Sequence, residues 1–225
     1  MVDYKLTRTS RVSIGMYIRD GFIEVRAPFF YSVSDIDKFV RSREKWAANR
    51  LAESKERVAK RKSFCLTYGS QVTYRGELYT IAEKENGKSG FIDTFFFVPP
   101  NMTPEEIKRH CINAYQLHAE TILYNRALKF IERMVVLPSD LKINNAKARW
   151  GSCSAKKSVN IAWRLIMADD SAIDYVIVHE LAHLIEYNHS AGFWAVVESY
   201  IPDYKEQQAK LKTLEYKLSF ENWDR

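Results

Sequence analysis

The alternation of apolar and polar positions predicts that the first part of the chain is built mainly from short strands. Residues 12–28 alternate on both sides of Asp20-Gly21, a pair that favours the tight turn of a β-hairpin. Apolar runs separated by turn residues recur over residues 71–98, and we expect 91–98 to form one buried strand. The first part of the chain is therefore expected to be rich in β-structure.

One long polar helix is predicted between these strands, beginning at Ser34 and reaching about Lys62. Ten residues of the segment 38–62 are Lys or Arg and three are Glu, so this segment accounts for the whole net charge of +6. The simpler interpretation is a solvated helix face on which Glu pairs with Lys and Arg. The alternative is a surface that binds nucleic acid or another polyanion, and both interpretations stay open.

A second long helix is predicted from Thr103 to about Val135. Thr103 is suited to cap this helix, Pro104 to its first turn, and Glu106 to complete a capping box. The helical spacing of the apolar residues predicts which side packs against the core. The residues expected on that side are Ile107, Cys111, Ala114, Leu117, Thr121, Leu128 and Ile131.

The second part of the chain mixes strands with helices, and the whole pattern predicts an α+β fold. Residues 146–153 and 157–168 read as two strands joined by a polar turn. We expect an N-terminal β-rich segment with the basic helix over residues 1–100, and a C-terminal domain over residues 101–225. The two parts are expected to form one compact unit.

Three of the five histidines lie close together, on and after a helix that Asp169 is suited to cap. His179 and His183 are four residues apart on this helix, so both rings project from one side and can bind one zinc ion. Glu180 lies about 100° around the helix from His179 and can reach a metal-bound water without being a ligand. This HExxH arrangement predicts a metal site.

A third protein ligand leaves zinc one open position for water. Tyr187-Asn188 is typical of a helix end, after which the chain can turn back and bring His189 to the metal. Ser190 is expected to cap the following helix, and Glu198 on that helix is the alternative ligand. We favour His189, because its neutral imidazole matches the first two ligands and the loop to it is short.

Such a site suits hydrolysis better than a purely structural role. Three nitrogen ligands leave zinc an open position, and Glu180 is not needed for binding the metal. Zinc lowers the pKa of a bound water towards ~7, and Glu180 is placed to act as its general base and then to protonate the leaving group. The residues therefore predict a hydrolase with one zinc ion per chain.

Residues 148–168 (ARWGSCSAKKSVNIAWRLIMA) and 174–204 (DYVIVHELAHLIEYNHSAGFWAVVESYIPDY) resemble the YgjP-like zinc metallopeptidases, which are related to SprT-like and WLM proteases. The resemblance implies a zincin-like metallopeptidase core in the second part, with the three histidines as zinc ligands and Glu180 as catalytic base. The chain departs from the related HExxHxxGxxH pattern, because Glu186 stands where that pattern has Gly. No methionine follows His189 either, which excludes the Met-turn of that group.

The two strands before the metal helix also gain a role from the resemblance. In zincin folds an edge strand beside the metal can pair with an extended peptide through main-chain hydrogen bonds. The alternative is that the tryptophans of these strands anchor the core. Cys153 is interpreted as a buried thiol, with inhibitory zinc binding as the minor alternative. The candidates for the substrate edge are Trp150, Gly151, Ser152, Asn160 and Trp163.

Composition limits the cellular setting. The N-terminus lacks a signal-peptide core, and no run approaches the ~18 apolar residues of a membrane span. The three cysteines form neither a metal-ligand cluster nor an even disulfide set, which suits a reducing compartment. We therefore expect a cytoplasmic protein with no membrane partner.

Three functions remain after these steps. The favoured one is a zinc-dependent peptidase that acts on a peptide or protein substrate. The second is a nucleoside triphosphate pyrophosphohydrolase, because zinc hydroxide also attacks phosphorus and the 38–62 helix could gather an anionic nucleotide. The third is a protease that the same helix brings to nucleic acid, a mode of binding that weakens steeply with salt.

Overall fold

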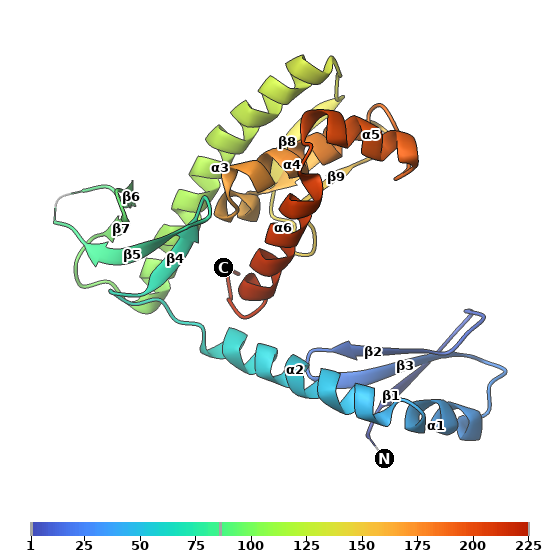
Figure 1. Ribbon diagram of the computed structural model, residues 1–225. Coiled ribbons are helices and arrows are strands. Elements are labelled where there is room, and N and C mark those ends of the chain that lie inside the picture. Colours follow the sequence, from blue (N-terminus) through green and yellow to red (C-terminus); the bar gives the residue numbers. More distant parts are fainter. Residues whose placement is uncertain (1, 86, 225) are drawn as a thin grey trace. The chain divides into compact units, whose positions relative to one another are not determined.

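The computed structural model describes residues 2–85 and 87–224 (Figure 1). Contacts within the chain divide it into two units, Met1–Phe64 with Lys217–Asn222 and Cys65–Tyr216 with Trp223–Arg225. The described residues form three small sheets accompanied by helices, so the fold is α+β, as predicted.

The first unit is a three-stranded sheet with two helices. Its elements are β1 (Lys5–Thr9), β2 (Gly15–Arg19), β3 (Phe22–Pro28), α1 (Val33–Arg41) and α2 (Glu44–Ser63). The predicted hairpin is confirmed, because β2 and β3 pair antiparallel around Asp20 and Gly21, whose φ angles are 47° and 81°. β1 pairs with the other side of β3 and runs parallel to it.

The prediction of a single helix from Ser34 to Lys62 is wrong in one respect, because this segment forms two helices, α1 and α2. α1 begins one residue earlier, where the hydroxyl of Ser32 accepts a hydrogen bond from the backbone N–H of Asp35. The helical conformation is interrupted at Arg43, whose φ and ψ are −120° and 13°. Both helices still pack on the sheet, since Val40 of α1 and Ala47 of α2 are buried in the same core cluster.

The second unit holds the other two sheets. One contains β4 (Gln71–Tyr74), β5 (Glu77–Glu83), β6 (Gly90–Ile92) and β7 (Phe95–Val98), in the order β4-β5-β7-β6. The other contains β8 (Asp140–Asn144), β9 (Gly151–Cys153) and β10 (Ser158–Ala162), in the order β8-β10-β9. The helices are α3 (Pro104–Met134), the 3-10 helix η1 (Trp163–Met167), α4 (Asp170–Ala182), α5 (Ala191–Tyr200) and α6 (Tyr204–Leu218).

The boundary between the units falls at residues 64 and 65, whereas the sequence suggested residues 100 and 101. The β4–β7 sheet belongs to the second unit because it is bonded to the helices there. Tyr115 of α3 donates a hydrogen bond to the carbonyl oxygen of Thr73 at 2.7 Å. The backbone N–H of Arg75 donates to the carbonyl oxygen of Ile166 in η1 at 2.9 Å.

Two predicted strands differ from the observed ones. Residues 91–98 form a hairpin, β6 and β7, because Asp93 takes a positive φ of 52° and reverses the chain. The strand predicted over residues 157–168 ends at Ala162, and η1 follows it. In addition β8, which the pattern did not reveal, pairs parallel with β10.

The capping box of α3 is confirmed, but the core side of this helix was predicted only in part. Thr103 and Glu106 make both hydrogen bonds of the capping box. Leu117 and Leu128, which we expected in the core, are 63% and 44% exposed. From Tyr115 to Ala127 the buried residues recur every four positions, which leaves both leucines off the core side. The buried residues in the middle of the helix are Cys111, Ile112, Ala114, Tyr115, Ala119, Leu123 and Ala127.

No helix within residues 2–85 and 87–224 combines the length and the apolar character needed to cross a membrane.

Candidate metal centre

Helix α4 contains His179, has His183 as its C-cap residue, and is fixed in the second unit. The carboxylate of Asp169 caps it by accepting a hydrogen bond from the N–H of Ala172 at 3.0 Å. The helix is buried along most of its length, which accounts for its mainly apolar composition. It ends at Ala182, earlier than the end predicted near Tyr187-Asn188. His183 follows as the C-cap with helical φ and ψ, so it keeps its position four residues from His179.

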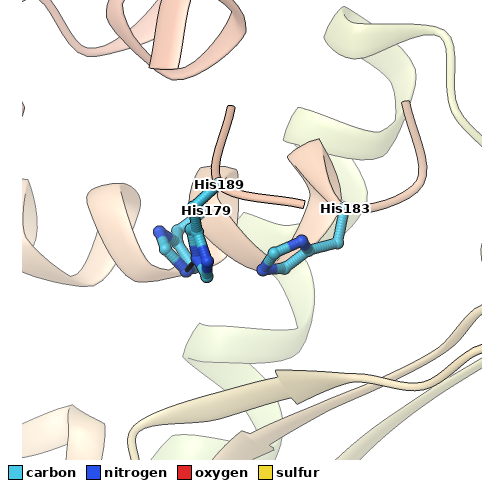
Figure 2. Close-up of side chains that lie close together, drawn as sticks. All are labelled: His179, His183 and His189. Atoms are coloured by element: carbon cyan, nitrogen blue, oxygen red, sulfur yellow. Dashed lines mark hydrogen bonds between the residues drawn. The ribbon is translucent and has the colours of Figure 1, made fainter. Parts of the chain in front are cut away.

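The structure brings His179, His183 and His189 together, as Figure 2 shows. Their candidate ligand atoms all lie within 4.8 Å of one another, and the Nε2 atoms of His179 and His189 are 3.1 Å apart. The loop after α4 returns His189, and the hydroxyl of Ser190 then caps α5 as predicted. Phe193 of α5 packs against all three rings, with centroid distances of 5.0, 4.6 and 4.6 Å.

Hydrogen bonds orient two of these rings. Nδ1 of His183 lies 3.1 Å from the carbonyl oxygen of Tyr187, which can only accept, so Nδ1 carries the proton and Nε2 has a free lone pair. Nδ1 of His179 lies 3.4 Å from the hydroxyl of Tyr175. That hydroxyl accepts a hydrogen bond from Gln208 of α6 at 2.9 Å. Contacts at Nδ1 leave the Nε2 atoms free for a metal.

The surroundings favour uncharged imidazoles, the form that binds metal. Burial, together with smaller contributions from the charges of His183 and His189, lowers the pKa of His179 to about 4. Burial also lowers the pKa of His183, and the charge of His189 acts in the same direction. Three imidazole nitrogen donors gathered at this distance fit a zinc ion.

The carboxyl group of Glu180 lies beside the histidines and is almost fully buried, with 7% of the residue exposed. Burial raises the pKa of Glu180 to about 7, while the charge of Arg149 and a hydrogen bond from the backbone N–H of Cys153 oppose the rise. Glu180 packs directly on Gly151 of β9. A Cβ atom at residue 151 would lie 2.5 Å from Cγ of Glu180, so only glycine leaves room for the carboxyl group there.

The residues predicted as a substrate edge have different positions in the sheet. Within the described residues β9 pairs only with β10, so Gly151 and Ser152 lie on an edge strand. Asn160 lies in the central strand and pairs with both neighbours, which excludes it from an edge. Trp163 is in η1, 2% exposed, and its Nε1 donates to Asn145 at 2.8 Å, so it anchors the core. Trp150 precedes β9 and is half-buried.

A pocket of about 470 Å³ opens beside Glu180 and His179. Trp150 and Gly151 form part of its wall, and Arg149 lines it as well. Helix α6 supplies the opposite residues, including Gln208, Leu211 and Lys212. The sequence reading missed α6 as part of the site because nothing in its local pattern shows that it lies next to α4.

The alternative ligands lie outside the histidine cluster. Glu198 is exposed on α5 and is not among the residues whose ligand atoms converge. The thiol of Cys153 contacts the carbonyl oxygen of Ser154 at 3.7 Å and is not in the cluster either. Burial and the charge of Glu180 raise the pKa of Cys153, which favours the thiol over the metal-binding thiolate.

The known structures that this chain resembles include crystal structures of two metallopeptidase zymogens. Abylysin from Pyrococcus abyssi is 21% identical, with 41% of this chain and 93% of that chain covered and a TM-score of 0.38. Jannalysin from Methanocaldococcus jannaschii is 20% identical, with 40% and 94% covered and a TM-score of 0.37. A search of curated proteins finds no match.

The match to a protein family covers more of the chain than the matches to known structures do. Residues 12–214 match the family described as YgjP-like, metallopeptidase domain, so the match covers most of both units. A metallopeptidase hydrolyses peptide bonds with a metal cofactor, and the three histidines are a group that could hold one. The chain therefore belongs to the YgjP-like family of metallopeptidases.

Proposed function

We propose that the protein is a zinc-dependent peptidase in which His179, His183 and His189 hold one zinc ion and Glu180 is the general base. The observation that carries this proposal is the meeting of three imidazoles, with ligand atoms within 4.8 Å of one another, beside one buried carboxyl group. Three nitrogen ligands and a neighbouring glutamate that does not bind the metal are typical of a catalytic zinc site.

The histidines and Glu180 have different roles in the proposed hydrolysis. Zinc bound by the histidines would polarise the scissile carbonyl group and make water a stronger acid. Glu180 takes a proton from the attacking water and passes it to the nitrogen of the leaving amine. The N–H of Cys153 and the backbone of Gly151 hold the carboxyl group of Glu180 in place, so little freedom is lost when it acts.

The edge strand β9 offers a place for the substrate. Gly151 and Ser152 can pair with an extended peptide, whose scissile bond then lies near Glu180 because β9 packs on that residue. The pocket lined by Arg149, Trp150 and Lys212 can receive a neighbouring side chain. Main-chain pairing tolerates many sequences, so this pocket is where selectivity would arise.

A peptide-library digestion tests the proposal. Wild-type protein should contain about one zinc per chain, and Glu180→Gln should keep that zinc while peptide cleavage falls about 10²–10⁴-fold. Glu198→Gln is the matched control, because it removes an exposed carboxylate outside the cluster and should change neither quantity. A wild type that binds no zinc, or a Glu180→Gln variant that cleaves normally, would contradict the proposal.

A second candidate is phosphoanhydride hydrolysis of a nucleoside triphosphate. The observation in its favour is that Arg149 and Lys212 line the pocket beside Glu180, and neither forms an ion pair with any residue in the described part of the chain. These cations could bind phosphates. Release of pyrophosphate that is lost in Glu180→Gln, together with no peptide cleavage by the wild type, would favour this candidate over the peptidase.

A further inference from the structure

A second pocket lies in the first unit, where α1 ends and α2 begins. It has a volume of about 320 Å³ and is lined by Met16, Phe39, Arg43 and Trp46. Met16 comes from β2, while the other three follow one another at spacings of four and three residues. Phe39 belongs to α1 and Trp46 to α2, and Arg43 lies at the interruption between the two helices. None of these residues belongs to the candidate metal centre.

The walls of this pocket are flat and partly apolar. The guanidinium group of Arg43 lies 4.1 Å from the centroid of the Phe39 ring, the geometry of a cation–π contact. Trp46 is 46% exposed, which is unusual for so large an aromatic side chain unless it contacts a partner. Planar guanidinium and aromatic groups are the surfaces on which nucleobases stack.

Positive charge is concentrated along the segment that carries Phe39, Arg43 and Trp46, and it is incompletely neutralised. Residues 38–50 contain five Lys or Arg and one Glu. Lys38 pairs with Asp35 at 3.6 Å and Arg50 with Glu53 at 3.0 Å. Among the described residues the remaining three cations, Arg41, Arg43 and Lys45, form no ion pair with an acidic residue.

We propose that the Met16–Phe39–Arg43–Trp46 pocket takes an unpaired base of single-stranded nucleic acid. The phosphates on either side of that base contact the unpaired cations Arg41, Arg43 and Lys45. A single strand fits better than a duplex, because a base must be unstacked and splayed out to enter a pocket. It fits better than an acidic peptide, because carboxylates give the flat walls of the pocket nothing to stack on.

Fluorescence anisotropy of the full-length chain with a labelled oligothymidylate of about 16 nucleotides tests this proposal. Trp46→Ala should weaken binding roughly 5–150-fold, the loss that corresponds to ~1–3 kcal/mol for one stacked base. Trp46→Phe keeps an aromatic face and should lose much less. Circular dichroism confirms that each variant is folded, and normal binding by folded Trp46→Ala would overturn the proposal.

Matched charge variants separate the pocket from general electrostatics. Arg43→Ala with Lys45→Ala and Arg57→Ala with Lys62→Ala each remove two positive charges from the same basic stretch, and Arg57 and Lys62 are likewise exposed and unpaired among the described residues. The pocket pair should lose at least about tenfold in affinity at fixed salt, and the salt slope should fall by roughly one for each phosphate contact removed. Equal losses in the two pairs would overturn the proposal.

An oligonucleotide made only of abasic residues provides the last test. If a base occupies the pocket, an oligonucleotide of abasic residues should bind wild type as weakly as the thymidylate binds Trp46→Ala, and the two losses should not add. Additive losses would contradict base insertion. Equally tight, Trp46-dependent binding of polyglutamate or of anionic lipid vesicles would assign the pocket to another class of partner and also overturn the proposal.

Discussion

Helix α4 and the α1–α2 segment are the two regions for which the sequence suggests a binding function. Histidines indicate it in α4, and Lys and Arg residues indicate it in the α1–α2 segment. In α4 two candidate ligands are four residues apart on one helix, so their convergence follows from local geometry. In the α1–α2 segment the charge was visible, but the pocket was not. That pocket depends on an interruption at Arg43 and on Met16 from a neighbouring strand. Local spacing predicts a site only when one element carries most of it.

The two regions also differ in how their ionisable side chains are exposed and paired. Around α4 burial lowers the pKa values of His179 and His183 and raises the pKa of Glu180 to about 7. At the start of α4 Asp170 is paired with Arg75 and Arg126. Along α1 and α2, in contrast, several cations face solvent without an acidic partner among the described residues. Buried neutral groups suit metal binding, whereas exposed unpaired cations suit a polyanion.

The largest effect expected is on metal content. His179→Ala removes one of the three proposed ligands and should reduce bound zinc from about one per chain to well below that, because two imidazoles bind zinc much more weakly. Oligonucleotide binding should be unchanged, since His179 has no part in the Phe39–Trp46 pocket. Metal analysis after dialysis measures the first effect and anisotropy the second. Retention of full zinc would contradict the three-histidine site.

A smaller but more specific effect is expected at Gly151. In Gly151→Ala the new methyl group would meet Glu180 Cγ at 2.5 Å, so the carboxyl group must move while the histidines stay in place. Peptide cleavage should fall about tenfold to a hundredfold with zinc retained, because small displacements of a catalytic group are costly. Gly90→Ala is the control, since a Cβ there meets nothing within 4 Å. Equal activity in the two variants would show that Gly151 does not position Glu180.

The ion pairs at the start of α4 should affect stability only modestly. Arg75 donates to Asp170 through Nε at 2.8 Å, and this contact is the main reason why the pKa of Asp170 is lowered. Both side chains are partly exposed, so Arg75→Ala should cost about 1 kcal/mol of unfolding free energy at neutral pH. Arg75→Lys keeps the charge without the two-pronged geometry and should cost less.

The pH dependence of that loss has a definite sign. A lowered pKa in the folded state stabilises the protein above the ordinary aspartate pKa of about 3.9, and the contribution disappears as the pH falls through the folded value. Denaturant unfolding should therefore separate wild type from Arg75→Ala at pH about 7, and the difference should shrink as the pH falls below the ordinary aspartate pKa of about 3.9. A difference that persists in acid would assign the effect to packing.

The smallest effect is expected at Cys153. Cys153→Ser keeps the backbone N–H that contacts Glu180 and removes a thiol that lies outside the histidine cluster. Zinc content and cleavage should both stay close to wild type. A marked gain in cleavage would support the minor alternative in which the thiol of Cys153 binds the zinc ion and inhibits the enzyme.

Much of the fold was predictable where a feature depends on neighbouring residues. The Asp20-Gly21 hairpin, the capping box at Thr103 and the cap at Asp169 were all read from short stretches. Predictions failed where the outcome depends on distant partners. Leu117 and Leu128 fit the helical spacing but are exposed. They were wrongly predicted to be buried because the sequence does not show which side of α3 packs against the rest of the unit. The division of the chain into units likewise depends on contacts between distant residues.

By itself the sequence determined the three histidines, the glutamate between two of them and the amount of charge on the basic segment. These features follow from the 3.6-residue period of a helix and from simple counting. The tertiary structure alone decided that Gly151 makes room for Glu180, that α6 closes the neighbouring pocket, and that Met16 completes a pocket with Phe39, Arg43 and Trp46. Each of these joins residues far apart in the chain, and only packing brings such residues into contact.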